Sequence, residues 1–228
     1  MKRSTLESLQ RARADKVPVA LVSHLEEGSQ GLIYGDGQAV SIPVLAPDQI
    51  SEIREMLRAA RSGMLAEGTL FVRSYVPAYR LLIIGAVHIA QALSTIAAQC
   101  GYQVTVIDPR RAFATEERFA GVELSTQWPD EAMARLRPDA QTAVVTLAHD
   151  PKIDDPALVA ALNSEAFYIG ALGSRRTHSK RLERLTEQGM GEQLARINAP
   201  VGLKLGGRSH AEIAVAILAQ LIQARYGE

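Results

Sequence analysis

The segment 81–90 has the pattern of a strand, a glycine turn and a helix that together bind a diphosphate. The apolar run 81–84 is typical of a buried strand, Gly85 follows it, and a helical pattern begins at His88. A second apolar run ends at Asp108, where a dinucleotide-binding unit places an acid. In such a unit the backbone of the turn approaches the phosphates, and the acid accepts hydrogen bonds from a ribose. The sequence therefore predicts a site for a nucleotide-like anion.

The turn departs from the usual G-x-G-x-x-G/A fingerprint, because Val87 occupies the position of the second glycine. That glycine gives the pyrophosphate room, so we expect the branched side chain of Val87 to project toward the phosphate. Two interpretations stay open. Either the anion binds in a shifted position, or the sheet kept the turn and lost its ligand.

A second loop with residues that could take part in chemistry contains His149 and Asp150, which follow the strand-like run 143–147. The fourth strand lies beside the first in the order 3-2-1-4-5-6, so His149 is expected to face His88 across the ligand site. His149 is the candidate for a base, a proton donor or a metal ligand, and a turn stabilised by Asp150 is the alternative. His88 is either a ligand contact or a polar residue in the first turn of a helix.

A third loop leads into a helix that begins with two arginines. Its glycines supply a flexible backbone, its serine a capping hydroxyl and its arginines two groups that bind phosphate bidentately. These residues are Gly170, Gly173, Ser174, Arg175 and Arg176. They predict a second phosphate clamp at a helix N-terminus. The alternative is a solvated basic face balanced by Glu183 and Glu187.

The segment 108–111 also allows two interpretations. Asp108 is placed to accept a ribose hydroxyl, whereas Arg110 or Arg111 meets an additional phosphate or points into solvent. A metal site is not predicted, because the five histidines are scattered and form no H-x-x-x-H or H-E-x-x-H motif. The chain also lacks the G-x-S-x-G motif of many serine hydrolases.

Strand and helix patterns alternate after residue 80, which predicts an α/β fold with a Rossmann-like, doubly wound parallel sheet. Strands are expected at 81–84, 104–107, 121–124, 143–147 and 167–169. Helices are expected after Pro129, at 156–162, from Thr177 and from Ser209, where Ser209 and Glu212 form a capping box.

The first 75 residues predict a small N-terminal α+β unit, followed by the Rossmann-like domain at 76–228. The expected elements of the N-terminal unit are a helix at 5–14, a strand at 17–22, a hairpin of 32–34 with 39–42 around a glycine turn, a helix capped by Asp48 and ended by Gly63, and a strand at 69–72.

Composition excludes several classes of protein. The 228 residues are 47% hydrophobic, which is enough for a sizeable core, and 25 basic residues balance 25 acidic ones. No global field therefore favours nucleic acid or an anionic membrane. The charged N-terminus and the single cysteine are typical of a cytoplasmic protein. Cys100, at the end of an apolar helix, is expected to be buried.

Four segments, in order along the chain, resemble motifs of one family. They are 84–90 (G-A-G-H-[VI]-A), 108–119 (D-P-R…F-A-T-x-E-R-F), 148–154 (T-H-D-P-K-x-D) and 168–178 (Y-I-G-x-[LI]-G-S-x-R-T-H). The family is XdhC/CoxI, the xanthine dehydrogenase accessory factors. Its members look after the molybdenum cofactor and deliver it to molybdenum hydroxylases such as xanthine dehydrogenase.

The resemblance implies a cofactor chaperone rather than a catalyst. It implies that molybdopterin is bound, that a xanthine-dehydrogenase-type molybdoenzyme is the partner, and that a sulfurtransferase or a second copy of the chain is a further partner. The implied binding residues are Gly85, Ala86, Val87, His88, Asp108, Arg110, His149, Gly170, Gly173, Ser174, Arg175 and Arg176.

Three features depart from the family pattern. Asn198 and Lys204 replace a histidine and an aspartate, Val87 replaces a glycine, and the N-terminal S-G-G-C segment is missing. Two alternatives therefore stay open. One is an NAD(P)-dependent oxidoreductase with His149 as proton donor, against which Val87 counts. The other is an interaction module whose Rossmann site is empty.

Overall fold

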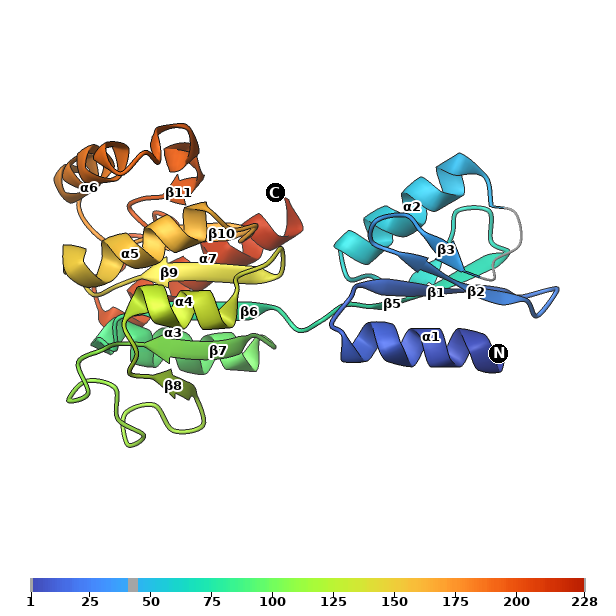
Figure 1. The fold of residues 1–228 in the computed structure, drawn as a ribbon, viewed down its shortest axis with the longest axis horizontal. Coiled ribbons are helices and arrows are strands. Elements are labelled where there is room, and N and C mark those ends of the chain that lie inside the picture. Colours follow the sequence, from blue (N-terminus) through green and yellow to red (C-terminus); the bar gives the residue numbers. More distant parts are fainter. Residues whose placement is uncertain (1, 41–44, 228) are drawn as a thin grey trace. The chain divides into compact units, whose positions relative to one another are not determined.

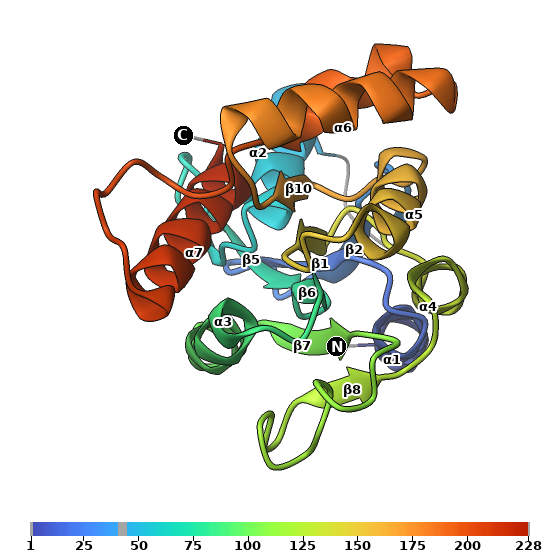
Figure 2. The same cartoon turned by 90° about the vertical axis from the view of Figure 1, so that its left-hand side faces the viewer.

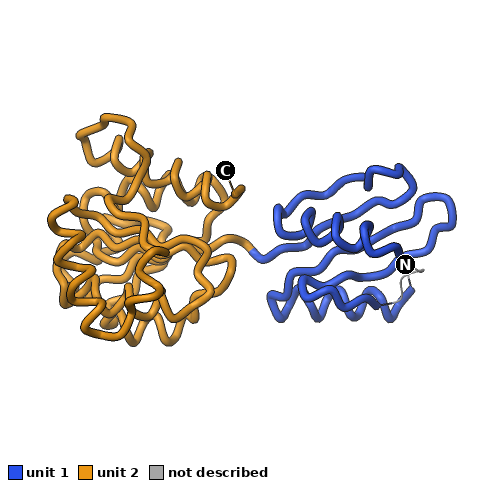
Figure 3. The backbone as a smooth tube through the Cα atoms, turned by 90° about the horizontal axis from the view of Figure 1, so that it is seen from above, with its two compact units in different colours: residues 1–77 blue, residues 78–228 orange. Residues whose placement is uncertain are grey.

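The computed structural model describes residues 2–40 and 45–227. The chain divides into two compact units, unit 1 at residues 1–77 and unit 2 at residues 78–228 (Figure 3). The boundary expected from the sequence, after residue 75, lies at the end of the last strand of unit 1.

Unit 1 contains a five-stranded antiparallel sheet with one helix on each face. The strand order is β3-β2-β1-β5-β4. The strands are β1 (Val19–His24), β2 (Gln30–Tyr34), β3 (Ala39–Val40), β4 (Gly63–Met64) and β5 (Leu70–Tyr75), and the helices are α1 (Arg3–Ala14) and α2 (Pro47–Arg58). Alternate residues of β1 face opposite sides, so Val19 packs with α1 while Ala20 and Val22 pack with α2.

Two expected signals in unit 1 are wrong, and a third falls partly outside the described residues. Helix α2 begins at Pro47 after the N-cap Ala46, so Asp48 stands in the first turn, where its charge suits the helix dipole. The same helix ends at Arg58, and Gly63 belongs to β4. The predicted hairpin is present as β2 and β3, but its residues 41 and 42 are not among those described.

Unit 2 contains a six-stranded parallel sheet in the order β11-β10-β9-β6-β7-β8. Its strands are β6 (Arg80–Ile84), β7 (Gln103–Ile107), β8 (Glu123–Ser125), β9 (Thr142–Thr146), β10 (Tyr168–Ala171) and β11 (Ile197–Asn198). Since β9 lies beside β6, the predicted order and the topological switch between first and fourth strands are both confirmed.

The helices of unit 2 cover both faces of this sheet (Figure 1). They are α3 (His88–Gln99), α4 (Pro129–Leu136), α5 (Pro151–Leu162), α6 (Arg175–Glu187) and α7 (His210–Tyr226), with a 3-10 turn at Gly191–Arg196. Leu81 and Ile83 pack on the α3 and α7 side, whereas Leu82 and Ile84 pack on the α4 and α5 side. This two-sided burial explains why β6 is an uninterrupted apolar run.

Three local predictions in unit 2 need correction. Helix α5 begins at Pro151 rather than Pro156, because Asp150 caps it and its side chain accepts a hydrogen bond from the Lys152 amide. The short strand β11 was not predicted, since two residues carry no periodic signal. Cys100 is exposed rather than buried, because it is the C-cap of α3 and lies beyond Ala97, the last buried residue of that helix.

None of the helices in the described ranges, 2–40 and 45–227, is both long and apolar enough to cross a membrane.

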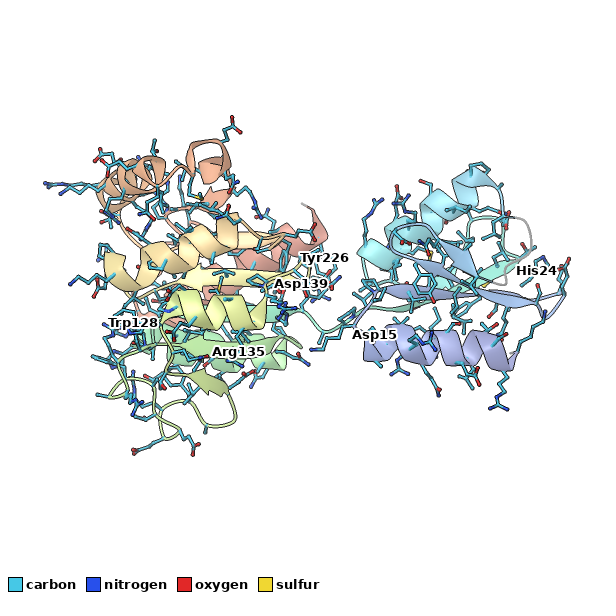
Figure 4. The ribbon with its side chains drawn as sticks, viewed as in Figure 1. Asp15, His24, Trp128, Arg135, Asp139 and Tyr226 are labelled. Atoms are coloured by element: carbon cyan, nitrogen blue, oxygen red, sulfur yellow. The ribbon has the colours of Figure 1, made fainter. Side chains whose placement is uncertain are left out.

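Unit 2 is expected to fold without unit 1. Each of the four apolar clusters formed by the described residues lies within one unit. The single tryptophan, Trp128, belongs to unit 2 and is half exposed at the start of α4 (Figure 4). A fragment of residues 78–228 should therefore show the same urea midpoint by Trp128 fluorescence as the full chain. A fragment without a cooperative transition would contradict this independence.

Candidate functional site

The carboxyl ends of the parallel strands of unit 2 meet at one edge of the sheet, which faces the viewer in Figure 2. The turn after β6, the loop after β7, the loop after β9 and the turn that precedes α6 all leave the sheet there. This edge is where ligands bind in open α/β sheets. The topology thus brings the sequence-predicted loops to a common side.

Asp108 binds the protein's own backbone and Arg110 at this edge. Its carboxylate accepts hydrogen bonds from the Ala86 amide at 2.8 Å and the Arg110 amide at 2.9 Å. The Arg110 guanidinium adds two more, from Nε at 2.9 Å and Nη2 at 2.8 Å. Burial alone would raise the pKa of Asp108, but these hydrogen bonds outweigh it and the pKa is lowered.

The roles expected for Asp108 and Arg110 gain no support from this geometry. Asp108 is fully buried, with both oxygens occupied, so no acceptor is presented to a ribose. Arg110 binds Asp108 and lies over the Phe113 ring at 4.6 Å, and its side chain is 34% exposed. The ribose contact remains a prediction from the sequence.

The glycine turn is closed against the loop after β9. Gly85 has φ +103°, and a Cβ atom there would lie 2.7 Å from the Ala148 amide nitrogen. Val87 is partly buried and packs with the apolar cluster on the α3 and α7 side, contrary to the expectation that it projects toward a phosphate. Gly85 is therefore required by the contact with Ala148 as well as by its backbone conformation.

The two histidines expected to face each other have different surroundings. The His88 ring stacks on that of His210, with centroids 5.1 Å apart, and both residues are exposed at the starts of α3 and α7. His149 is exposed in a left-handed conformation, φ +60°, just before the Asp150 cap. No hydrogen bond or ring contact found in the described part of the chain joins His88 to His149.

The N-terminal turn of α6 has the predicted cap. The Ser174 hydroxyl accepts a hydrogen bond from the Thr177 amide at 3.1 Å. The two glycines before it have structural roles. A Cβ at Gly170 would lie 2.6 Å from Val201 Cγ2, and Gly173 has φ +143°. Both residues are thus needed for close approach of other side chains or for a left-handed backbone.

Arg175 and Arg176 do not converge on one ligand, because they line two different cavities. Arg176 lines a cavity of about 250 Å³ between α5 and α6, which we call the α5–α6 cavity. It is formed by His149, Pro151, Asp154, Asp155, Arg176, Thr177, Lys180, Arg181 and Arg184. Arg175 lines a cavity of about 970 Å³ formed by residues 197–207 and α7, which we call the β11–α7 cavity.

The α5–α6 cavity holds two acids that sequence analysis did not assign. Asp155 pairs with Arg184, at 2.6 Å from Nε and 3.0 Å from Nη2. Asp154 is almost fully buried, and burial raises its pKa to about 7. Its nearest cation is Arg181, whose Nη2 lies 3.9 Å from Asp154 Oδ2.

Arg181 is buried on the helix stripe where an apolar residue is expected. Together with Leu185, four residues later, it is one of the buried residues of α6. The sequence showed it only as part of a basic helix. The signal that could have identified it is its position on the same helix face as Leu185. An arginine is rarely fully buried without a partner, so an arginine on a buried face indicates a specific role.

Among the residues that the structure describes, no group of three or more histidine, cysteine, aspartate or glutamate side chains could hold a metal ion.

The strand order, the glycine turn and the cavities at the carboxyl edge define unit 2 as a Rossmann-type domain with room for ligands. Residues 81–221 match the XdhC Rossmann domain, and the chain belongs to that family.

Curated relatives extend the similarity beyond unit 2. The chain is 33% identical to "Molybdenum cofactor insertion chaperone PaoD" of Escherichia coli, across 96% of this chain and 58% of that protein. It is 30% identical to a probable xanthine dehydrogenase subunit of Bacillus subtilis, across 68% of this chain and 46% of that protein. The chain therefore spans about half the length of these relatives.

A solved structure shares the fold. The crystal structure of a xanthine dehydrogenase from Bacillus halodurans superposes with a TM-score of 0.74 at 24% identity, covering 99% of this chain and 65% of that one.

Replacing Gly85 by alanine should destabilise unit 2 by about 3 kcal/mol or more, because left-handed strain adds to overlap with Ala148. Gly101→Ala is the matched control, since Gly101 has φ +84° but nothing within 4 Å of an added Cβ. It should cost only about 1–2 kcal/mol. Urea unfolding followed by Trp128 fluorescence measures both. Equal losses would show that Ala148 moves freely out of the way.

Asp154 should make unit 2 less stable as the pH rises from about 4 to 7. The folded carboxyl holds its proton until about pH 7, whereas the unfolded one releases it near its ordinary pKa of 3.8. The contribution of Asp154 to stability then falls by about 1.4 kcal/mol per pH unit in this range. Asp154→Asn removes this dependence, so its stability relative to the parent should rise with pH. Urea unfolding across this range measures the difference, and parallel curves would refute the raised pKa.

Proposed function

We propose that the chain binds the molybdenum cofactor at the carboxyl edge of unit 2 and helps to insert it into a xanthine-dehydrogenase-type molybdoenzyme. The observation that carries this proposal is the β11–α7 cavity, whose volume of about 970 Å³ is at the upper end of small-molecule sites. The 33% identity to the Escherichia coli insertion chaperone, across almost the whole chain, supports the choice of ligand.

The β11–α7 cavity has the charge that a phosphate-bearing pterin requires. Arg175 and Lys204 both line it, both are exposed, and neither forms an ion pair with another described residue. Lys204 stands where the family has an aspartate, so this departure adds positive charge. Glu212, the acid that also lines the cavity, is held by Ser209 and the Arg208 amide as part of the capping box.

The rest of the cavity wall is fixed by internal hydrogen bonds. Gln220 Oε1 accepts from the Tyr168 hydroxyl at 2.6 Å and from the Gly202 amide at 2.7 Å. The Asn198 side chain donates to the Ile169 carbonyl at 3.1 Å. Asn198, which replaces the family histidine, therefore anchors β11 to β10, and the wall is preorganised for a bound molecule.

The proposed role in cofactor insertion also determines which other partners we propose. The enzyme receives the cofactor in the cytoplasm, and a sulfurtransferase and a second copy of this chain are further proposed partners. None of these steps requires the chain to act as a catalyst, and His149 has no assigned step.

The double variant Arg175→Ala/Lys204→Ala should bind the cofactor at least about tenfold more weakly than the parent, since charge-assisted hydrogen bonds are worth about 1.5–3 kcal/mol each. The control is Lys152→Ala/Arg208→Ala, which removes the same charge from exposed residues that line neither cavity. Binding is measured as pterin fluorescence and molybdenum content of the protein after denaturation.

Insertion is measured by activation of apo xanthine dehydrogenase with cofactor-loaded chain. Equal cofactor binding by the double variant and its control would remove the β11–α7 cavity from the proposal. A nicotinamide nucleotide released from the purified protein, in place of a pterin, would favour the oxidoreductase.

A further inference from the structure

Arg181 is a buried cation whose hydrogen-bonding capacity is largely unused. It is 2% exposed, and its Nη2 donates to the Leu172 carbonyl at 2.9 Å. Its Nε and Nη1 are buried and have no hydrogen-bond partner among the described residues. A buried donor without a hydrogen-bond partner lowers the free energy of unfolding. We therefore expect an acceptor from outside the chain to bind beside this guanidinium.

Arg181 lines the α5–α6 cavity, and the charge of that cavity is positive. Four cationic side chains line it against two carboxyl groups. Asp155 already binds Arg184 with both oxygens, so that pair is satisfied internally. Arg176 and Lys180 are exposed, and neither forms an ion pair with a described residue.

Asp154 is a weak counter-ion for Arg181. Its separation of 3.9 Å from Nη2 is too long for a hydrogen bond, and its Oδ1 accepts from the Ala148 amide at 3.2 Å. Since its pKa is about 7, the carboxyl is partly protonated at neutral pH. The described residues that line the cavity therefore leave it with excess positive charge.

Eight of the nine lining residues come from facing sides of two helices, which gives the cavity rigid walls, and the ninth, His149, lies in the loop before α5. From α6 they are Arg176, Thr177, Lys180, Arg181 and Arg184, and from α5 they are Pro151, Asp154 and Asp155. The α6 residues follow the spacing of one helix face. A volume of about 250 Å³ lies below the range of whole drug-sized ligands, so it suits a single anionic group.

We propose that the α5–α6 cavity is a phosphate-binding site in which Arg181 is the buried anchor and Arg176 and Lys180 bind from the mouth. Guanidinium N–H groups form charge-assisted hydrogen bonds to phosphate oxygens, and Arg181 Nε and Nη1 are two unused donors on different sides of its guanidinium. The site is separate from the β11–α7 cavity and does not depend on cofactor insertion. Its ligand is either free phosphate or the phosphate monoester end of a larger molecule.

The test is titration of the full chain with inorganic phosphate in a chloride buffer of constant ionic strength, measured by calorimetry. Arg176→Ala/Lys180→Ala should weaken binding at least about tenfold. The charge-matched control, Lys152→Ala/Arg208→Ala, should change it less than about twofold, because neither residue lines the cavity. Equal losses in the two variants would mean that phosphate follows net charge, and the site would be rejected.

The role of Arg181 is tested without replacing it, since a buried arginine can be needed for folding. With ¹⁵N-labelled arginine, the Nε–H resonance of Arg181 should shift as phosphate binds, and the shift should be smaller in Arg176→Ala/Lys180→Ala at the same subsaturating phosphate concentration. Phosphate binding without this shift would overturn the anchor. An absence of binding at millimolar phosphate would overturn the site and leave the proposed cofactor cavity untouched.

A parallel titration with phenyl phosphate distinguishes the two sources of the ligand. Tighter binding than inorganic phosphate supports the end of a larger molecule, and weaker binding supports the free ion. Both ligands should lose affinity in Arg176→Ala/Lys180→Ala. A ligand that binds this variant as tightly as it binds the parent would count against the site.

Discussion

The Asp108 carboxylate joins the carboxyl ends of two neighbouring strands, and the ligand edge of unit 2 depends on it. It follows β7, yet it accepts a hydrogen bond from Ala86 in the turn after β6. A fully buried charge is tolerated only when donors surround it, and here two backbone amides and the Arg110 guanidinium do so. The glycine turn is thereby fixed to the end of β7 on one side and, through Gly85, to Ala148 on the other.

This constraint explains how a Rossmann turn persists without the usual fingerprint. In a dinucleotide-binding protein the acid after the second strand and the second glycine serve the ligand. Here the acid serves the turn itself, and Val87 packs into the core. Cationic side chains line the α5–α6 and β11–α7 cavities, on the far side of the topological switch. The chain keeps the Rossmann turn while its acid and Val87 make internal contacts.

Much of unit 2 could be predicted from the sequence because its strands are buried on both faces. The run 81–84 is continuous and apolar, and 143–147 is interrupted only by Thr146, so strand positions and order followed from pattern and topology. The caps at Ser174 and Ser209 were equally predictable, since each is a hydrogen bond between residues close in the sequence. Other local signals were not predictive, since Ala46 rather than Asp48 is the N-cap of α2, and Asp150 caps α5, which begins at Pro151 rather than Pro156.

The candidate site was less predictable, because the relevant contacts join residues far apart in the chain. Adjacent arginines suggested one clamp, but successive helix positions point in different directions, and Arg175 and Arg176 line separate cavities. Burial of Arg181 depends on how α6 packs on α5, and a basic sequence alone does not show it.

The two units have separate apolar cores. Because each unit buries its own apolar residues, substitutions can accumulate in the N-terminal sheet without weakening the Rossmann core, so the two halves are free to evolve at different rates.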